Sequence, residues 1–334
     1  MNALVLAYAE KMTSFTAKIP TVQVARSVLA IATMTVLITT SWDNLTPEIA
    51  GLGRPSYCEP PLSIGLFCLD TSQDKVLARC IVTSILALVV LGVVPAVTSW
   101  LHAWAAFSFS VGIGLPDGGE QVSQIVTALL VLLCVDNWSW CAWLPKQAEM
   151  LRSVPIASRS AGIRWAAWVG LRIQVAYIYL DSGLSKIPQE DWLNGSAMYY
   201  FVRDPSFGGT GPIGDALRWI TSSDPGVAFL TWVPLLVEIA IALLIFGSHS
   251  KRKLALALAA ALHVGIILLI GLWSFGLIMI ASVALACLPY YRGGGSLLVS
   301  THQQKPVNNS SLPRENLITS LKVSYFVRRL VNVR

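Results

Sequence analysis

Long apolar stretches separated by short polar segments dominate the pattern along this chain. Eight of them approach or reach the roughly 20 residues that cross a bilayer as a helix, at 22–42, 79–99, 102–115, 121–135, 163–184, 227–247, 253–271 and 274–288. They are continuously apolar, whereas the strands of a membrane barrel are short and alternate. A backbone in lipid must also satisfy its own hydrogen bonds. The pattern therefore predicts an all-α fold, a polytopic membrane bundle of about eight transmembrane helices.

The composition supports this class. Hydrophobic residues make up 54% of the 334 positions and charged residues only 13%, against roughly 25% charged in a soluble domain. The first 20 residues contain Glu10, Lys11 and Lys18 and lack the compact apolar core of a cleavable signal peptide.

Lysine and arginine in the connections indicate the orientation. Basic residues gather at the N-terminus (Lys11, Lys18 and Arg26), in the 137–164 and 248–253 connections, and after Arg292. With eight spans these segments share one side, which the positive-inside rule assigns to the cytoplasm. We therefore expect a cytoplasmic N-terminus at 1–21, a membrane domain at 22–292 and a flexible basic cytoplasmic tail at 293–334.

The loop at 43–78 is expected outside, because its five acidic residues outnumber its two basic ones. The tail carries six basic residues against one acid, and we expect it to contact anionic membrane lipids. The basic residues that set the orientation and those in the tail account for the net positive charge of the chain, so no nucleic-acid partner is predicted.

Two cysteines lie in that outer loop. Cys58 and Cys68 stand in "YCEPPLSIGLFCLD", where Pro60, Pro61 and Gly65 let the chain turn back. Disulfides persist outside the cytoplasm, so the pattern favours a structural disulfide. A redox-active pair is the alternative, although the spacing differs from the C-x-x-C of thiol oxidoreductases.

Ionisable groups inside the predicted spans are the main site candidates, because they are costly in lipid and face the protein interior. In "WVGLRIQVAYIYLDSGLSK", helical spacing aligns Arg172, Tyr179 and Lys186 on one stripe, with Gln174 and Asp181 on the next. Arg172 and Lys186 would lie about 21 Å apart along the helix.

Lys186 has the most informative surroundings. Pro188 should end the helix, and Trp192 should return to the membrane interface, where tryptophan is favoured. Such a hook would keep Lys186 partly desolvated. Burial penalises the ammonium form, so a lysine held there can act as a base. The alternative is an anchoring lysine whose amine reaches into water.

Three further polar residues lie in predicted spans: Glu238, His263 and His102. A lone histidine in a helix more often bonds to a neighbour than to a metal. No H-E-x-x-H motif or carboxylate cluster appears, so no metal site is predicted.

The segment "LRIQVAYIYLDSGLSKIPQEDWLNGSAMYY" resembles the membrane domain of the vitamin K-dependent gamma-carboxylase, in the HTTM superfamily. Seven positions fit that family's pattern: Arg172, Gln174, Tyr179, Gly183, Lys186, Trp192 and Gly195. "LHVGIILLIGLWSFGLIMIASVAL" is similar to its later histidine-containing helix and the helix after it. "CEPPLSIGLFCL" and "FSFSVGIGLPDGGEQVSQI" resemble the sporulation-delaying protein B (SdpB) family more closely. The resemblance covers 22–289.

The resemblance implies a mechanism. In the carboxylase the lysine matching Lys186 deprotonates vitamin K hydroquinone, which implies a quinol-type cofactor here. The carboxylase also has a large lumenal domain where this chain has a short tail, and a second lysine where this chain has Ser185. Asp117 and Glu120 would face outward on the side of Lys186 and line the same cavity.

The SdpB likeness implies a bacterial cell-membrane protein that helps mature an exported antimicrobial peptide toxin precursor, together with a small SdpA-type partner. Two alternatives stay open. One is a non-catalytic immunity, transport or scaffold protein, in which the polar groups only hold helices together. The other is a thiol oxidase that works through Cys58 and Cys68.

Overall fold

The computed structural model describes residues 15–17, 19–48, 56–114, 117–144, 159–205, 208–287 and 290–292. All of them belong to one compact unit, Met1–Gly293. The predicted tail at 293–334 and most of the predicted N-terminal segment at 1–21 lie outside the described residues.

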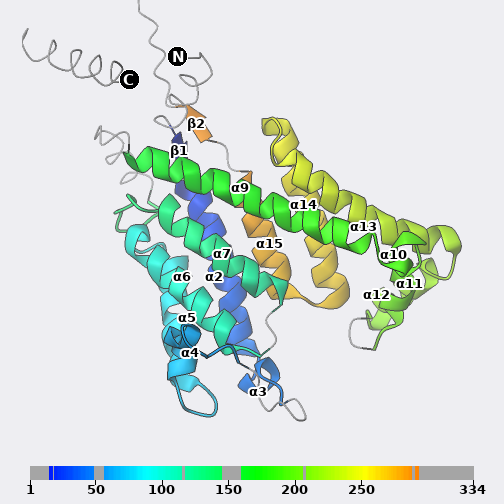
Figure 1. Ribbon diagram of the computed structural model, residues 1–334, viewed down its shortest axis with the longest axis horizontal. Coiled ribbons are helices and arrows are strands. Elements are labelled where there is room, and N and C mark those ends of the chain that lie inside the picture. Colours follow the sequence, from blue (N-terminus) through cyan, green and yellow to red (C-terminus); the bar gives the residue numbers. More distant parts are fainter. Residues whose placement is uncertain are drawn as a thin grey trace, which may run out of the picture. The chain divides into compact units, whose positions relative to one another are not determined.

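Among the described residues, eight helices have at least 14 residues, and they correspond to the eight apolar stretches (Figure 1). They are α2 (Ile19–Thr39), α5 (Val76–Val90), α6 (Pro95–Gly112), α7 (Gly118–Leu133), α9 (Arg159–Lys186), α13 (Asp224–Leu244), α14 (His249–Ile270) and α15 (Trp273–Ala286). Three of these, α2, α13 and α14, are long and apolar enough to cross a membrane. The helical class is confirmed, and eight crossings remain a prediction.

Short elements connect the long helices. They are α3 (Trp42–Leu45), η1 (Leu62–Ile64), α4 (Leu66–Leu69), α10 (Glu190–Leu193), α11 (Ala197–Arg203) and α12 (Gly211–Ile220). The sequence did not predict one antiparallel pair, β1 (Phe15–Ala17) with β2 (Tyr290–Arg292), in which Thr16 lies opposite Tyr291. The pair joins the segment before α2 to the segment after α15, so both lie at the same end of the bundle.

The break between the second and third predicted stretches falls earlier than expected. The sequence analysis placed it at residues 100–101, whereas α5 ends at Val90 and α6 begins at Pro95. Proline lacks an N–H and disfavours helical backbone in the residue before it. Val94 lies outside the helical region, with φ 29°, and Gly92 has φ 73°. Pro95 fits the first helical position, where an N–H has no partner in the helix.

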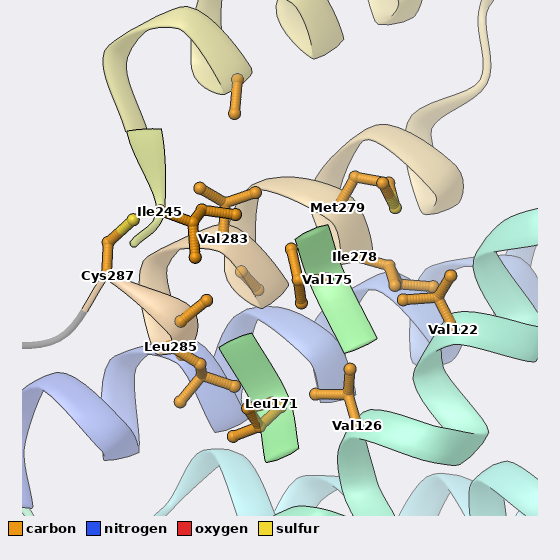
Figure 2. Close-up of a cluster of buried hydrophobic side chains, with 14 of the residues drawn as sticks. Val122, Val126, Leu171, Val175, Ile245, Ile278, Met279, Val283, Leu285 and Cys287 are labelled. Atoms are coloured by element: carbon orange, nitrogen blue, oxygen red, sulfur yellow. The ribbon is translucent and has the colours of Figure 1, made fainter. Parts of the chain in front are cut away.

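The main core is built around α15, most of which is buried. Figure 2 shows side chains of α7, α9 and α15 meeting there, with Val126, Leu171 and Ile278 each at most 1% exposed. Small residues lie buried at the helix contacts: Ala25, Ala32, Ala167, Ala176, Ala255, Ala259, Ala281 and Ala286. Lipid tails are as apolar as leucine, so close packing between small residues stabilises such contacts.

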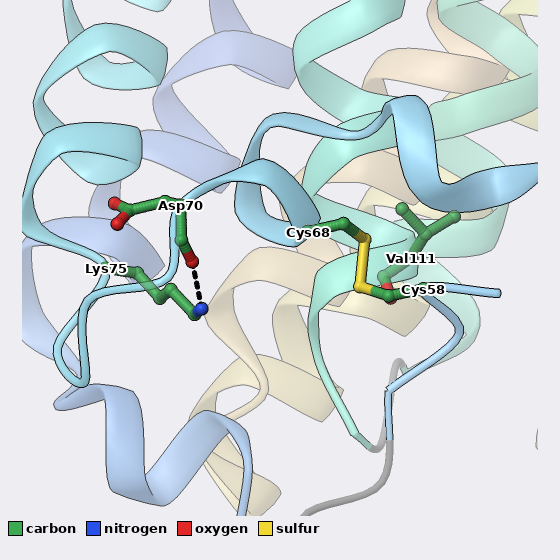
Figure 3. The surroundings of a disulfide bond; sticks show 5 residues. All are labelled: Cys58, Cys68, Asp70, Lys75 and Val111. Carbon is green, nitrogen blue, oxygen red and sulfur yellow. Dashed lines mark hydrogen bonds between the residues drawn. A yellow bond between two sulfur atoms is a disulfide. The ribbon is translucent and has the colours of Figure 1, made fainter.

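A second core joins α2, α5 and α6 to the predicted outer loop. Trp42 stacks on Phe67 with ring centroids 5.0 Å apart, and Phe67 contacts Phe109 edge-on at 5.9 Å. Cys58 and Cys68 form a disulfide in this loop (Figure 3). They border a cavity of about 350 Å³ that Trp42 and Phe67 also line.

Asp70 links this loop to the start of α5. Its carboxylate accepts hydrogen bonds from the Ser72 hydroxyl at 2.6 Å and from the N–H of Ala78, in the first turn of α5, at 3.0 Å. The Ser72 bond, followed by the Ala78 bond, holds the pKa of Asp70 below its usual value. The Lys75 ammonium donates to the Asp70 backbone carbonyl (Figure 3). Asp70 therefore provides the cap that Lys75, at the N-cap position, does not supply.

Candidate functional site

The candidate site forms where α9 packs closely against α13 at Gly183. A Cβ on Gly183 would lie 3.0 Å from Cγ1 of Ile239 and 3.6 Å from the Leu235 carbonyl oxygen. A larger residue at this position would have to displace the Ile239 side chain. As a result, the side chains that follow Gly183 on α9 reach Glu238 on α13.

Lys186 and Glu238 form an ion pair at this contact. The Lys186 ammonium donates to Oε1 of Glu238 at 2.7 Å and to Oε2 at 2.5 Å. The Ser182 hydroxyl accepts from Lys186 Nζ at 3.1 Å and donates to Glu238 Oε1 at 3.2 Å. The Lys186 side chain is 24% exposed and that of Glu238 12%. The three residues form a closed hydrogen-bonded set that is largely shielded from water.

The hook predicted after Lys186 is present. The long helix α9 ends at Lys186, and α10 brings Trp192 back so that its ring centroid lies 5.2 Å from Lys186 Nζ. This distance is within range of a cation–π interaction. The Trp232 indole fixes the hook by donating to the Trp192 carbonyl at 2.9 Å. Gly195, with φ 84°, turns the chain against the same indole.

Beside the hook lies a groove of about 520 Å³, and Trp192 is shared between the groove and the ion pair. The groove mixes acidic and aromatic side chains. Its lining residues are Gln189, Glu190, Asp191, Trp192, Ala197, Tyr200, Phe201 and Asp204. The site thus combines a shielded amine, a carboxylate and an aromatic ring at the edge of an accessible groove.

A second polar contact lies two helical turns from Lys186 on the same stripe of α9. The Tyr179 hydroxyl and Nε2 of His263 are 2.6 Å apart, and both residues are 2% exposed. The His263 ring also meets Phe275 edge-on, with centroids 5.3 Å apart. The sequence prediction that His263 bonds to a neighbouring residue is met. Together the two contacts connect α9 with α13, α14 and α15.

The other α9 candidates lie outside this set. Arg172 donates to the carbonyl of Ile245, the C-cap residue of α13, and its guanidinium lies 4.6 Å from the Trp168 ring centroid. A cation at a helix C-terminus is stabilised by the helix dipole. Gln174 is half-buried and Asp181 is exposed.

Asp117 and Glu120 act as a helix cap. The Asp117 carboxylate accepts from the N–H of Gly119 at 2.6 Å and of Glu120 at 3.1 Å, and Glu120 accepts from the N–H of Asp117 at 3.1 Å. This reciprocal capping box starts α7. Glu120 also accepts from the Ser274 hydroxyl at 3.3 Å, which ties α7 to α15. Both groups are thereby engaged in structural contacts.

His102 lies on α6, in the other half of the bundle, and is 1% exposed. Its neighbour there is Arg26, which is 0% exposed. Arg26, which the orientation argument grouped with the basic residues of the N-terminus, instead lies buried within α2.

The sequence analysis missed Ser182, which bonds to both members of the ion pair. The signal for it was present, because Ser182 lies one turn before Lys186 on the same helix face. In the described part of the chain, no group of three or more histidine, cysteine, aspartate or glutamate residues is placed to hold a metal ion.

The chain is similar to two proteins of Bacillus subtilis (strain 168). It is 28% identical to the uncharacterized protein YitO over 267 residues, and this aligned segment covers 79% of this chain and 84% of YitO. It is also 28% identical to the sporulation-delaying protein SdpB over 260 residues, and this aligned segment covers 77% of this chain and 78% of SdpB. No family model and no solved structure matches it. The chain is therefore a homologue of SdpB, and its long apolar helices fit a membrane protein.

Proposed function

We propose that this chain is a multi-pass membrane enzyme that helps convert an exported peptide toxin precursor into its active form. The name of SdpB connects that relative to sporulation delay, and the similarity suggests a role in a toxin pathway of that kind. The observation that carries the enzyme proposal is the shielded Lys186–Glu238 pair, which lies under Trp192 at the edge of a groove.

The pair changes how Lys186 would act. A carboxylate oxygen of Glu238 lies 2.5 Å from Lys186 Nζ, so we propose that Lys186 works together with Glu238. Lys186 Nζ can pass one of its protons to Glu238 and take up a substrate proton in its place, because Nζ donates to both carboxylate oxygens. Glu238 then stores the proton, and the Lys186 ammonium remains beside the group that lost it. The two residues therefore act as one base, with Lys186 as the relay.

Ser182 and Trp192 position this relay. Ser182 bonds to both Lys186 and Glu238, and Trp192 covers the amine from the groove side. Together they hold Nζ in one place and keep water away. Both effects raise the efficiency of proton transfer.

The residues of the groove fit the quinol-type cofactor that the carboxylase resemblance implies. Trp192, Tyr200 and Phe201 offer aromatic surface for a flat ring, and Lys186 offers a charged donor next to it. When bound, a reduced quinone would supply an acidic hydroxyl and reducing electrons. We propose membership of the HTTM superfamily on the same grounds.

The proposal includes a topology and partners. Eight helices would cross the membrane with both chain ends in the cytoplasm, and the β1–β2 pair supports a common side for the two ends. The hook and the groove would then face outward, where an exported toxin precursor and a small SdpA-type partner protein would meet them. Membrane lipids would surround the bundle.

One observation favours a second candidate, a non-catalytic scaffold or immunity protein. The hydrogen bonds of Lys186, Ser182 and Glu238 are closed on one another, which is also how a pair that only locks two helices is arranged. The two functions predict different results when arginine replaces Lys186.

Lys186→Arg separates them, since arginine keeps the charge and cannot release its proton. We would express the chain with its candidate precursor and follow precursor conversion by mass spectrometry at matched protein levels. An enzyme should lose at least about 100-fold in conversion, while Lys251→Arg on exposed α14 surface keeps the wild-type rate. Wild-type conversion by Lys186→Arg would refute the enzyme. Mass spectrometry of an organic extract of the purified protein tests for the quinone.

A further inference from the structure

The most unusual charge in the described part of the chain is Arg26. Its guanidinium is 0% exposed, and the ion pairs among the described residues join other groups. It donates to two neutral oxygens, Oε1 of Gln23 at 2.8 Å and Oγ1 of Thr98 at 3.0 Å. Its Nε has no hydrogen-bond partner. A buried charge is ordinarily paired, so this one needs an explanation.

The two oxygens are held in place for Arg26. The Gln23 amide nitrogen donates to the Val89 carbonyl at 2.7 Å, which turns its oxygen toward the guanidinium. The Thr98 hydroxyl donates to the Val93 carbonyl at 2.7 Å and so accepts from Arg26. The cation is therefore fixed between α2 and the first turn of α6, and it cannot reach water by a change of rotamer.

Two other polar side chains at this place also lack partners. His102 lies one turn after Thr98 on α6, is 1% exposed, and neither of its ring nitrogens is hydrogen-bonded. Ser99 is 2% exposed, and its hydroxyl has no partner. Helical spacing places His102 on the same face of α6 as Thr98, whose hydroxyl accepts from Arg26. Three unpartnered donors, the Arg26 Nε–H, an imidazole N–H and a hydroxyl, thus belong to Arg26 and to residues of α6 within one turn of its partner Thr98.

We propose that Arg26, Ser99 and His102 bind a small monovalent inorganic anion, chloride in the cell. A single positive charge calls for a single negative one. Water would satisfy the donors but would leave the charge unneutralised. The surroundings are fully buried, which excludes a lipid headgroup and favours an ion of halide size. The N-terminal end of α6 adds its positive dipole on the same side.

The segment after α7 covers the turn between α5 and α6, which precedes the helix that carries Thr98, Ser99 and His102. It crosses the turn between α5 and α6, where the Ala142 N–H donates to the Gly92 carbonyl at 2.9 Å and the Trp143 indole donates to the Val90 carbonyl at 2.9 Å. The anion would therefore be enclosed and would exchange slowly. Its role would be to neutralise Arg26 and so stabilise the contact of α2 with α5 and α6. This inference does not depend on the proposed enzyme function.

The test is the thermal unfolding of the purified full-length protein in sodium chloride, bromide or gluconate at constant ionic strength. We expect chloride and bromide to raise the wild-type midpoint saturably, and gluconate to leave it unchanged. Arg26→Gln should abolish the response. Arg79→Gln, which removes an arginine that bonds only backbone carbonyls of α2 and Thr40 in the same half of the bundle, should keep it. Equal wild-type midpoints in chloride and gluconate would overturn the proposal.

Two milder variants keep the test decisive if Arg26→Gln does not fold. Ser99→Ala and His102→Leu each remove one donor and should raise the half-saturating chloride concentration about tenfold. Unchanged half-saturation in both would reject the site. Ion chromatography of desalted, denatured protein gives a count that is independent of unfolding. About one chloride per chain supports the site, and none refutes it.

Discussion

Removing Glu238 should destabilise the protein measurably, because Lys186 would be left charged and poorly hydrated. Exposed ion pairs contribute about 0.2–1 kcal/mol, and breaking a fully buried pair costs about 3–5 kcal/mol. The side chains here are 24% and 12% exposed, which places the pair between these limits. For Glu238→Leu we expect a loss of about 2 kcal/mol, or roughly 5 °C in the unfolding midpoint of a chain this long. Intrinsic fluorescence in detergent measures it.

A double-mutant cycle isolates the pair. Lys186→Met combined with Glu238→Leu leaves no charge behind, so it should recover most of the loss, with a coupling of about 1–2 kcal/mol. The exposed pair Arg218–Asp215, whose side chains are 40% and 75% exposed, is the matched control and should couple by less than about 0.5 kcal/mol. If the two cycles give the same coupling, water screens the Lys186–Glu238 pair, and the argument for a shielded base fails.

Three further predictions concern the site helix and the loop. Gly183→Val should separate α9 from α13 and lower the free energy of unfolding by about 1–3 kcal/mol. Gly162→Val, with open space around it on α9, should change the free energy of unfolding little. Asp70→Asn should lower the midpoint near pH 7. Because the pKa of Asp70 is lowered in the folded protein, this difference should persist above about pH 5 and vanish as the pH falls through the lowered pKa. Replacing Cys58 and Cys68 by serine should cost about 2–3 kcal/mol and make the midpoint insensitive to reductant; a wild-type midpoint that reductant does not change would contradict this.

The helices were predictable because apolar runs of this length have few alternatives in a membrane. Their ends were less so. The boundary between the second and third stretches was predicted too late, because the sequence stays apolar through the turn before Pro95 although the helix ends there. Local backbone chemistry decided that boundary, and an average over apolar residues does not detect it.

The site was predictable only in part. The stripe on α9 and the hook at Trp192 follow from spacing and from Pro188, which are local features. The partner of Lys186 depends on how α13 packs against α9, which one sequence without homologues does not reveal. For that reason Glu238 was predicted only as one of several supporting polar groups and not as the partner of Lys186, and Ser182 was overlooked. The short helices α11 and α12 were missed because no long apolar run marks them.

The cations inside the bundle differ in how they are neutralised, and this difference ranks them as functional candidates. Arg172 bonds to a carbonyl at the end of α13 and lies against Trp168, an arrangement that stabilises helix packing. Lys186 has a carboxylate within hydrogen-bond distance and a groove beside it, so a proton can both arrive and leave. Arg26 has neither a carboxylate among the described ion pairs nor exposure to water. Proton transfer needs a partner that accepts the proton, and Glu238 is such a partner for Lys186. Anion binding needs a charge that its protein partners leave uncompensated, and that description fits Arg26.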